Sequence, residues 1–222
     1  MKKTALYLTL ALTLSACSAP SQQSESGASS ATATTAADTA ATTPPPAAAE
    51  QEKPMSYYQN KVAEMKTGKG TIVLRFFPDV APNHVRNFID LAEKGFYNGT
   101  KFHRVIEGFM IQGGDPNTRS GDPSTWGMGG AETNVKAEFN SKPHKRGVLS
   151  MARSQHPDSA SSQFFIVVKD SNFLDNQYTV FGEVLSGMDV ADAIVSAQKR
   201  PGSDMPVDPV AIESITVREE TK

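Results

Sequence analysis

From Met55 onwards the chain consists of short apolar runs separated by polar or glycine-containing segments. Many of these runs have the length and the content of β-branched and aromatic residues that are typical of strands. The predicted strands are residues 62–65, 71–77, 101–106, 109–112, 147–152, 164–168, 180–184 and 212–217. Apolar residues recur at helical spacing in two places, after Pro82 as far as Gly95 and from Met188 to Val195. The periodicity alone predicts a mainly β domain with two short helices.

The N-terminal residues have the order of charge and hydrophobicity that is typical of a secretory signal. Lys2 and Lys3 precede an apolar run from Ala5 to Leu14, and small residues follow up to Cys17. This run is about half the length of the roughly 20 residues that a transmembrane helix requires. We therefore interpret residues 1–16 as a cleavable signal peptide rather than as a permanent membrane span.

Cys17 is the only cysteine among the 222 residues, so the chain cannot form an intrachain disulfide. The run Leu14-Ser15-Ala16-Cys17 resembles a bacterial lipobox, in which cleavage before the cysteine accompanies its lipidation. We predict lipidation of Cys17, because several acyl chains at one terminus hold a protein on a membrane stably. An incidental free thiol is the alternative. Ser18, rather than an aspartate, follows the cysteine and resembles the pattern of lipoproteins that are sorted to the outer membrane.

Residues 17–54 are predicted to form a disordered tether. Between Ser18 and Lys53 there is no Val, Ile, Leu, Met or aromatic residue. Such a stretch cannot bury enough apolar surface to offset the entropy that is lost on ordering. As a flexible chain it would reach roughly 35 Å, although its serine and threonine content is also compatible with a glycosylated stalk. Residues 55–222 remain as one globular domain.

The charge balance and the histidines limit the possible partners. The formal net charge is −2 and residues 55–222 contain no cluster of lysine and arginine, so we expect no nucleic acid partner. The domain is also expected to be a monomer. The histidines show no metal-ligand spacing, and no hydrolase motif accompanies them, so we expect no metal and no cofactor. They are His84, His103, His144 and His156. His103 is expected to face away from its neighbour Arg104 and to be structural.

The stretch from Phe102 to Asp115 combines chemistry that a plain core strand does not need. Side chains alternate along a strand, so Arg104, Met110 and Gln112 are expected to share one face of two strands that bend at Gly108. This face suits a ligand that is partly polar and partly apolar. The stretch has no nucleophile, no pair of carboxylates and no metal-ligand spacing. Taken alone, it is equally compatible with a core strand that carries an incidental arginine.

The same stretch resembles the signature sequence of cyclophilins, the peptidyl-prolyl cis/trans isomerases, from Tyr97-Asn98-Gly99-Thr100 through Gln112-Gly113-Gly114. Two later pairs of blocks also resemble the family, and the resemblance extends over residues 62–219. These blocks are Leu149–Ala152 with Ser162–Ile166, and Phe173–Asp175 with Val180–Gly182. The resemblance implies a closed eight-stranded antiparallel barrel capped by two α-helices, an architecture that would leave no exposed strand edge.

The resemblance also implies the residues of the site. Cyclophilins use the arginine at the position of Arg104 to stabilise the twisted peptide bond, and a planar cation that does not titrate suits this role. Gln112 matches the amide that binds the substrate carbonyl, and Phe109 matches the pocket for the proline ring. The other residues that match the peptide groove are Met110, Gly127, Ala152, Arg153, Gln163, Phe165, Phe173, Leu174 and Tyr178. Without the resemblance, Phe165 and Leu174 would be interpreted as ordinary core.

The chain also departs from the family pattern. Phe173 and Tyr178 stand where many eukaryotic members carry a tryptophan and a histidine. Both replacements resemble those of bacterial members, and they predict weak binding of cyclosporin. Arg153 replaces an asparagine whose backbone makes the contact. The long loop from Pro116 to Val135 contains Gly127-Met128-Gly129-Gly130, which is not a phosphate loop because no Gly-Lys-Ser/Thr follows.

The leading prediction is a peptidyl-prolyl isomerase that assists the folding of exported proteins and acts on proline-containing polypeptides. The lipid on Cys17 would hold it at the bacterial cell envelope, on the outer membrane, with the domain in the periplasm or at the surface. The alternative is a proline-peptide-binding chaperone or adaptor with incidental catalysis, and only the tether and the long loop favour a surface adhesin. Arg104 together with Gln112 favours the enzyme, because binding alone does not require a donor beside the proline nitrogen.

Overall fold

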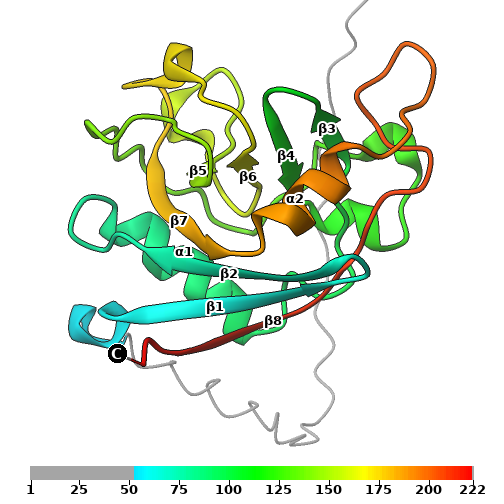
Figure 1. Ribbon diagram of the computed structural model, residues 1–222. Coiled ribbons are helices and arrows are strands. Elements are labelled where there is room, and N and C mark those ends of the chain that lie inside the picture. The colour runs from blue at the N-terminus through cyan, green and yellow to red at the C-terminus, as the bar shows by residue number, and fades with distance from the viewer. Residues whose placement is uncertain (1–52, 222) are drawn as a thin grey trace, which may run out of the picture. The chain divides into compact units, whose positions relative to one another are not determined.

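The computed structural model describes residues 53–221, so the predicted signal peptide, Cys17 and the predicted tether as far as Glu52 lie outside the described residues. The described part is built on one sheet of eight antiparallel strands (Figure 1). The strands are β1 Lys61–Thr67, β2 Gly70–Phe76, β3 Arg104–Ile106, β4 Met110–Gly113, β5 Val148–Met151, β6 Phe164–Val167, β7 Val180–Ser186 and β8 Ile212–Glu219. Their order in the sheet is β3-β4-β6-β5-β7-β2-β1-β8.

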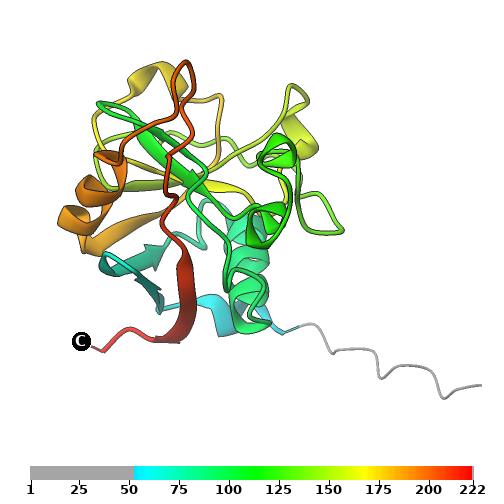
Figure 2. The same cartoon turned by 90° about the vertical axis from the view of Figure 1, so that its right-hand side faces the viewer.

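Two α-helices, α1 Pro82–Glu93 and α2 Met188–Val195, lie well apart from each other (Figure 2), and the buried apolar side chains of both helices belong to the same hydrophobic cluster. Both helices are predicted from the apolar spacing and both predictions are confirmed. The short turns of 3₁₀ helix are η1 Met55–Tyr58, η2 Pro116–Arg119, η3 Pro123–Thr125, η4 Pro157–Ser159 and η5 Asn172–Leu174. No helix in residues 53–221 has both the length and the apolar character needed to cross a membrane.

The sheet is a half barrel, and the predicted closed barrel is wrong. Closure would require β3 to pair with β8, but these two strands are the edges of the sheet. The outer edge of β3 is occupied by a loop instead, because Val105 donates its N–H to the carbonyl of Asp204 at 2.9 Å. Residues 99–102 join the start of β8 through single hydrogen bonds and one isolated bridge, Lys101 to Ala211. The predicted strand 101–106 is therefore a strand only from Arg104 onwards.

Alternate side chains of the central strands enter two different hydrophobic clusters. On β6, Phe164 and Ile166 belong to a large inner cluster, whereas Phe165 and Val167 belong to a smaller outer cluster. Period-two alternation along a strand explains this division. Both faces of β6 are apolar, so the strand appears in the sequence as a continuous apolar run.

Helix α1 fills the inner cluster and is fixed at its start by a carboxylate. Phe88 is fully buried, and its ring lies 4.9 Å from Tyr97 and 5.4 Å from Phe164. Glu138 accepts hydrogen bonds from the N–H of His84 at 3.0 Å and from its Nδ1 at 2.7 Å. Burial raises the pKa of the Glu138 carboxyl, but these hydrogen bonds outweigh burial and the pKa lies below its usual value.

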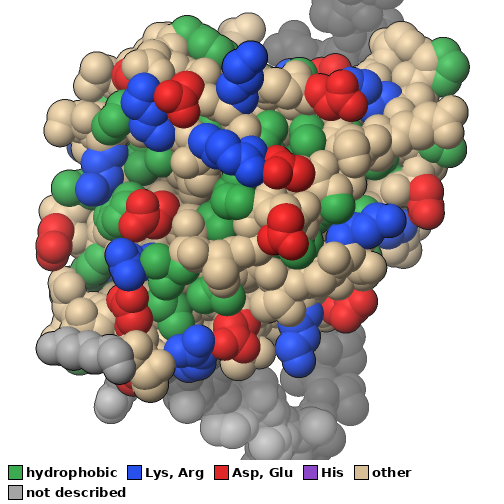
Figure 3. Space-filling view, viewed as in Figure 1, with side chains coloured by type: hydrophobic (Ala, Val, Ile, Leu, Met, Phe, Trp, Pro, Cys, Tyr) green, Lys and Arg blue, Asp and Glu red, His purple; other side chains and the backbone are tan. Residues whose placement is uncertain are grey.

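Cationic and anionic side chains are interspersed over the face of the molecule seen in Figure 3. Several charged side chains of the described residues form ion pairs, for example Arg146 with Asp192 at 2.7 Å and Arg218 with Glu64 at 2.8 Å. This face therefore has no extended region of one sign, which agrees with the small net charge of the chain.

Candidate active site

A cavity of about 640 Å³ lies beside the hairpin of β3 and β4. In this hairpin Arg104 stands opposite Gln112. Residues that face each other in an antiparallel pair project on the same side of the sheet, so the predicted common face is confirmed. Gly108 forms the turn with a φ of +70°, a conformation that glycine adopts without strain.

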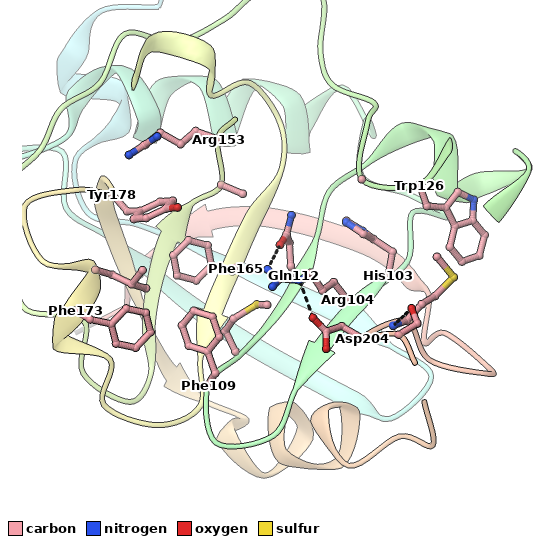
Figure 4. A pocket seen from close by; sticks show the side chains of 16 residues that line it. His103, Arg104, Phe109, Gln112, Trp126, Arg153, Phe165, Phe173, Tyr178 and Asp204 are labelled. Carbon is pink, nitrogen blue, oxygen red and sulfur yellow. Dashed lines mark hydrogen bonds and ion pairs between the residues drawn. The ribbon is translucent and has the colours of Figure 1, made fainter. Parts of the chain in front are cut away.

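Aromatic and apolar side chains form the wall on one side of Arg104 (Figure 4). This wall consists of Phe109, Met110, Ala152, Phe165, Phe173, Leu174 and Tyr178. Phe165 meets Tyr178 edge-on at 5.8 Å, and the ring of Phe109 lies 5.3 Å from that of Phe173. Phe173 is 66% exposed, so it forms the rim, whereas Phe165 is buried at the base. The wall can accept a compact apolar ring.

Two groups hold the guanidinium of Arg104 from different sides. Its Nε donates to Oδ2 of Asp204 at 3.2 Å, and its Nη1 donates to Oε1 of Gln112 at 3.5 Å. Both members of the Arg104–Asp204 ion pair are about half exposed, with side-chain exposures of 45% and 46%. Arg104 thus presents a fixed positive group at the mouth of the cavity.

A relay of amide side chains joins Gln112 to the long loop. Its Nε2 donates to Oε1 of Gln163 at 2.9 Å, and Nε2 of Gln163 donates to the carbonyls of Gly127 and Gly129 at 2.9 and 2.7 Å. The second hydrogen on Nε2 of Gln112 remains for a ligand carbonyl. Gly127 has a φ of +86°, which favours glycine at this position.

A different set of residues lies on the other side of Arg104 (Figure 4). This side consists of His103, Trp126, Ser203, Asp204 and Met205. Lys101 lies over the Trp126 ring at 5.4 Å. This half of the cavity is more polar and is built largely from loops.

His103 is buried at this end of the cavity, with 4% of its surface exposed. The sequence places His103 on the opposite face from Arg104, whereas its side chain lines the same cavity. Burial lowers the pKa of His103, the neighbouring Asp115 opposes this shift, and the charge of Arg104 adds to it. The imidazole is therefore kept neutral at a pH where an exposed histidine begins to take up a proton.

A buried polar cluster supports the aromatic wall from behind. His144 lies nearly parallel to the Phe165 ring at 6.2 Å, and its Nδ1 is 2.9 Å from Oδ1 of Asp175. Its Nε2 is 3.0 Å from Oγ of Ser150, which is fully buried. Burial lowers the pKa of His144, although the hydrogen bond to Asp175 acts in the opposite direction. Because both His144 and Ser150 are inaccessible, this cluster positions Phe165 and is not itself a reaction site.

Comparison with known proteins agrees with this architecture. Residues 62–217 match the family described as cyclophilin type peptidyl-prolyl cis-trans isomerase/CLD. The chain belongs to the cyclophilin family. A probable peptidyl-prolyl cis-trans isomerase of Brucella abortus is 43% identical to it over 163 residues, which cover 71% of this chain and 83% of the relative. Peptidyl-prolyl cis-trans isomerase B of Escherichia coli is 45% identical over 165 residues, which cover 69% and 97%.

Solved cyclophilins share the fold. The crystal structure of a cyclophilin type peptidyl-prolyl cis-trans isomerase of Cryptosporidium parvum, in the presence of the dipeptide Ala-Pro, gives a TM-score of 0.64 at 29% identity and covers 71% of this chain and 99% of that one. Cyclophilin AquaCyp293 of Hirschia baltica gives a TM-score of 0.59 at 29% identity, with coverages of 72% and 74%. Together with the relatives, these similarities identify the chain as a cyclophilin peptidyl-prolyl cis-trans isomerase.

The structure brings the predicted cyclophilin site together. Every predicted groove residue lines the main cavity except Gln163, which lines an adjoining cavity of about 390 Å³ together with Gly127, Ala152 and Arg153. Arg153 lies over the Tyr178 ring at 4.7 Å. The roles of these residues in binding and catalysis stay predictions. Among residues 53–221, no group of three or more His, Cys, Asp or Glu side chains could hold a metal ion.

Several cavity residues are not found by sequence reasoning. Trp126 is the only tryptophan of the chain and lies in the long loop from Pro116 to Val135. The unusual composition of this loop was the only signal in the sequence that pointed to it. Ser203, Asp204 and Met205 belong to a segment without strand or helix periodicity. The contact of Asp204 with Arg104 joins residues that are 100 positions apart, and no local pattern indicates it.

Proposed function

We propose that the main cavity holds a proline residue of a polypeptide and that Arg104 accelerates rotation about the preceding peptide bond. The observation that carries this proposal is the position of the Arg104 guanidinium beside an apolar wall that can accept a proline ring. The Ala-Pro dipeptide with which the Cryptosporidium cyclophilin was crystallised supports a proline-containing ligand. The substrates are accordingly proline-containing polypeptides.

The chemistry requires stabilisation of a twisted amide. Rotation about the bond before proline faces a barrier of about 18–20 kcal/mol, because the amide loses its resonance. In the twisted state the proline nitrogen becomes pyramidal and gains a localised lone pair. A hydrogen-bond donor beside this nitrogen stabilises the twisted state more than either planar state, and only such differential stabilisation increases the rate. The donors of Arg104 can fill this role without any transfer of a proton.

The other residues of the cavity position the substrate. The proline ring fits between Phe109 and Phe165, and the second hydrogen on Nε2 of Gln112 can hold a substrate carbonyl. A rate increase of 10⁵ requires about 7 kcal/mol of preferential stabilisation. A charge-assisted hydrogen bond can supply about half of this value once the bound peptide displaces water from the guanidinium, and fixing the substrate between the wall and Gln112 supplies the remainder.

Substitution of Arg104 tests this assignment. Arg104→Ala is expected to lower kcat/KM for a proline-containing peptide by about a hundredfold. Arg104→Lys should also be strongly impaired, because a point charge does not reproduce the planar set of donors. Arg218→Ala is a matched control, since Arg218 pairs with Glu64 away from the cavity. Activity of Arg104→Ala within twofold of the parent would show that Arg104 is not the catalytic group.

The same variants separate the enzyme from a binding module. If the groove works mainly as a binding site of a chaperone or adaptor, Arg104→Ala should weaken the binding of an unfolded polypeptide as strongly as it lowers the isomerase activity. Our proposal expects the catalytic loss without an equal loss of peptide binding, because the aromatic wall is unchanged in that variant.

We further propose that this cyclophilin acts at a bacterial cell envelope and assists the folding of exported proteins. The supporting observations come from the sequence: two lysines, an apolar run that ends at Leu14, and the lipobox-like residues before Cys17. In this proposal the lipid on Cys17 anchors the protein to the outer membrane, residues 17–54 form the tether, and the isomerase domain lies in the periplasm or at the surface.

Fractionation of cells that express the full chain tests the anchor. A lipidated protein should stay with membranes in high salt and be released by detergent, because an acyl anchor is apolar rather than electrostatic. Cys17→Ser should abolish the membrane association or leave an unprocessed precursor. An unmodified Cys17 in the mass spectrum of the mature native protein would contradict the anchor but would leave the isomerase assignment unchanged.

A further inference from the structure

The side chain that the proposed mechanism depends on is not fixed by its own strand. Arg104 begins β3, which has three residues and forms one edge of the sheet, and its side chain is 45% exposed. An arginine side chain has many accessible rotamers, so an unsupported guanidinium would sample many positions. Catalysis by a donor that must meet one nitrogen atom requires the donor to be held in place.

The restraint comes from the loop that follows α2. Oδ2 of Asp204 accepts from Nε of Arg104 at 3.2 Å, whereas Gln112 accepts from Nη1 on another edge of the same planar group. Two contacts on different nitrogens fix both the position and the plane of a guanidinium, which one contact cannot do. Within residues 53–221 this arrangement leaves Nη2 for the substrate.

Asp204 is itself placed by backbone hydrogen bonds. Its carbonyl accepts from the N–H of Val105, the residue directly after Arg104, at 2.9 Å. The loop is closed on itself, since Arg200 donates its N–H to the carbonyl of Met205 at 2.8 Å and Lys199 forms a bridge with Pro206. These backbone hydrogen bonds fix the position of the carboxylate relative to the strand that carries Arg104. A change of the Asp204 side chain leaves them intact.

We propose that Asp204 is a positioning residue for isomerisation. Its carboxylate holds the guanidinium of Arg104 in the orientation that meets the proline nitrogen. This inference rests on the proposed role of Arg104. The opposite effect, in which Asp204 would weaken catalysis by neutralising Arg104, is small because solvent screens a carboxylate that is half exposed. Removal of Asp204 should consequently slow the reaction rather than accelerate it.

Steady-state kinetics with Asp204→Ala, Asp204→Asn and Asp208→Ala tests the inference. Asp204→Ala is expected to lower kcat about fivefold with KM within twofold, because the ground-state contacts of the peptide with the aromatic wall remain. Asp204→Asn should lose less, since its amide oxygen can still accept from Nε. Asp208 is an exposed acid of the same loop with no role in the cavity, so Asp208→Ala should match the parent and controls for the loss of one negative charge.

A double-mutant cycle separates this inference from the role of Arg104. With Arg104→Ala already present, Asp204→Ala should have no further effect on kcat, because there is no guanidinium to orient. If Arg104→Ala alone has no effect, the proposed function fails. If Arg104→Ala is impaired but Asp204→Ala is as active as the parent or more active, the positioning role fails while the catalytic arginine stands.

The exchange rate of the Arg104 Nε–H with water, measured by NMR, reports on the contact with Asp204 and does not depend on the overall stability of the loop. In the parent this hydrogen should exchange slowly with water, and in Asp204→Ala it should exchange rapidly at unchanged melting temperature. An Nε–H signal that is the same in both proteins would overturn the inference.

Discussion

The inner and outer hydrophobic clusters of this cyclophilin are built by the same strands but differ in how completely they are covered. The inner cluster surrounds Phe88, and its buried members pack on all sides against other side chains. The outer cluster contains Phe165 and Leu174, but its partly buried members include Phe109 and Tyr178, which face the cavity. The apolar surface of the inner cluster is therefore fully covered in the protein alone. The outer cluster leaves apolar surface open, and a ligand that enters the cavity can cover it.

The largest effect on stability is expected from Phe88→Ala. Loss of a fully buried phenylalanine should lower the free energy of unfolding by about 4–5 kcal/mol, because the neighbouring aromatic rings cannot collapse into the space. Denaturant titration measures this change. Phe88→Leu, which keeps most of the volume, should lower it by only about 1.5 kcal/mol and leave kcat/KM unchanged. A loss of activity in a stable Phe88→Leu protein would contradict the separation of the two clusters.

Phe165→Ala should affect both properties. We expect a loss of about 3 kcal/mol of unfolding free energy, at the lower end for a buried phenylalanine, because the vacated space opens to the solvent-filled cavity. KM for a proline-containing peptide should rise about tenfold, since the wall of the proline pocket is lost. Calorimetry and steady-state kinetics on the same sample check the two effects. An unchanged KM would show that Phe165 belongs functionally to the core alone.

The two buried histidines near the cavity make stability depend on pH. Burial keeps the pKa values of His103 and His144 below the ordinary value of 6.5. As the pH falls below 6.5, the unfolded chain binds protons at these positions before the folded protein does, so stability decreases until the folded pKa values are passed. Melting temperatures between pH 8 and pH 5 should show this decrease.

Glutamine substitutions assign that pH dependence. His103→Gln and His144→Gln should each flatten the decrease, because glutamine does not titrate. An equally steep profile in the double variant His103→Gln/His144→Gln would refute the assignment.

The smallest effect is expected at the rim. Phe173→Trp should change the melting temperature little, because the side chain is 66% exposed, but the indole N–H adds a donor beside Phe109. Cyclosporin should inhibit the parent weakly and this variant about fivefold more strongly, the value of one additional hydrogen bond. Leu185→Trp places the same residue at another exposed apolar position and should not alter inhibition. Tight inhibition of the parent would refute the expectation.

Much of the fold could be predicted because each strand and helix is encoded by its own apolar pattern. The resemblance also located most of the cavity, including Arg104 and Phe165. Closure of the barrel could not be predicted, since it depends on which segment reaches the outer edge of β3, and Asp204 does so from a loop without periodicity. The contact between Asp204 and Arg104 depends on how two distant segments pack, which a single sequence does not contain.

The alternation along β6 has a consequence for insertions and deletions. Phe164 and Phe165 are neighbours in the chain, yet one lies in the inner cluster and the other in the wall of the proline pocket. Insertion of one residue in this strand would move every later side chain of the strand to the opposite face and would damage folding and ligand binding together. The loop between Pro116 and Val135 has no such alternation to keep. Changes in its length should therefore reshape the mouth of the cavity without shifting the register of the sheet, as long as Gly127 and Gly129 still accept the hydrogen bonds of Gln163.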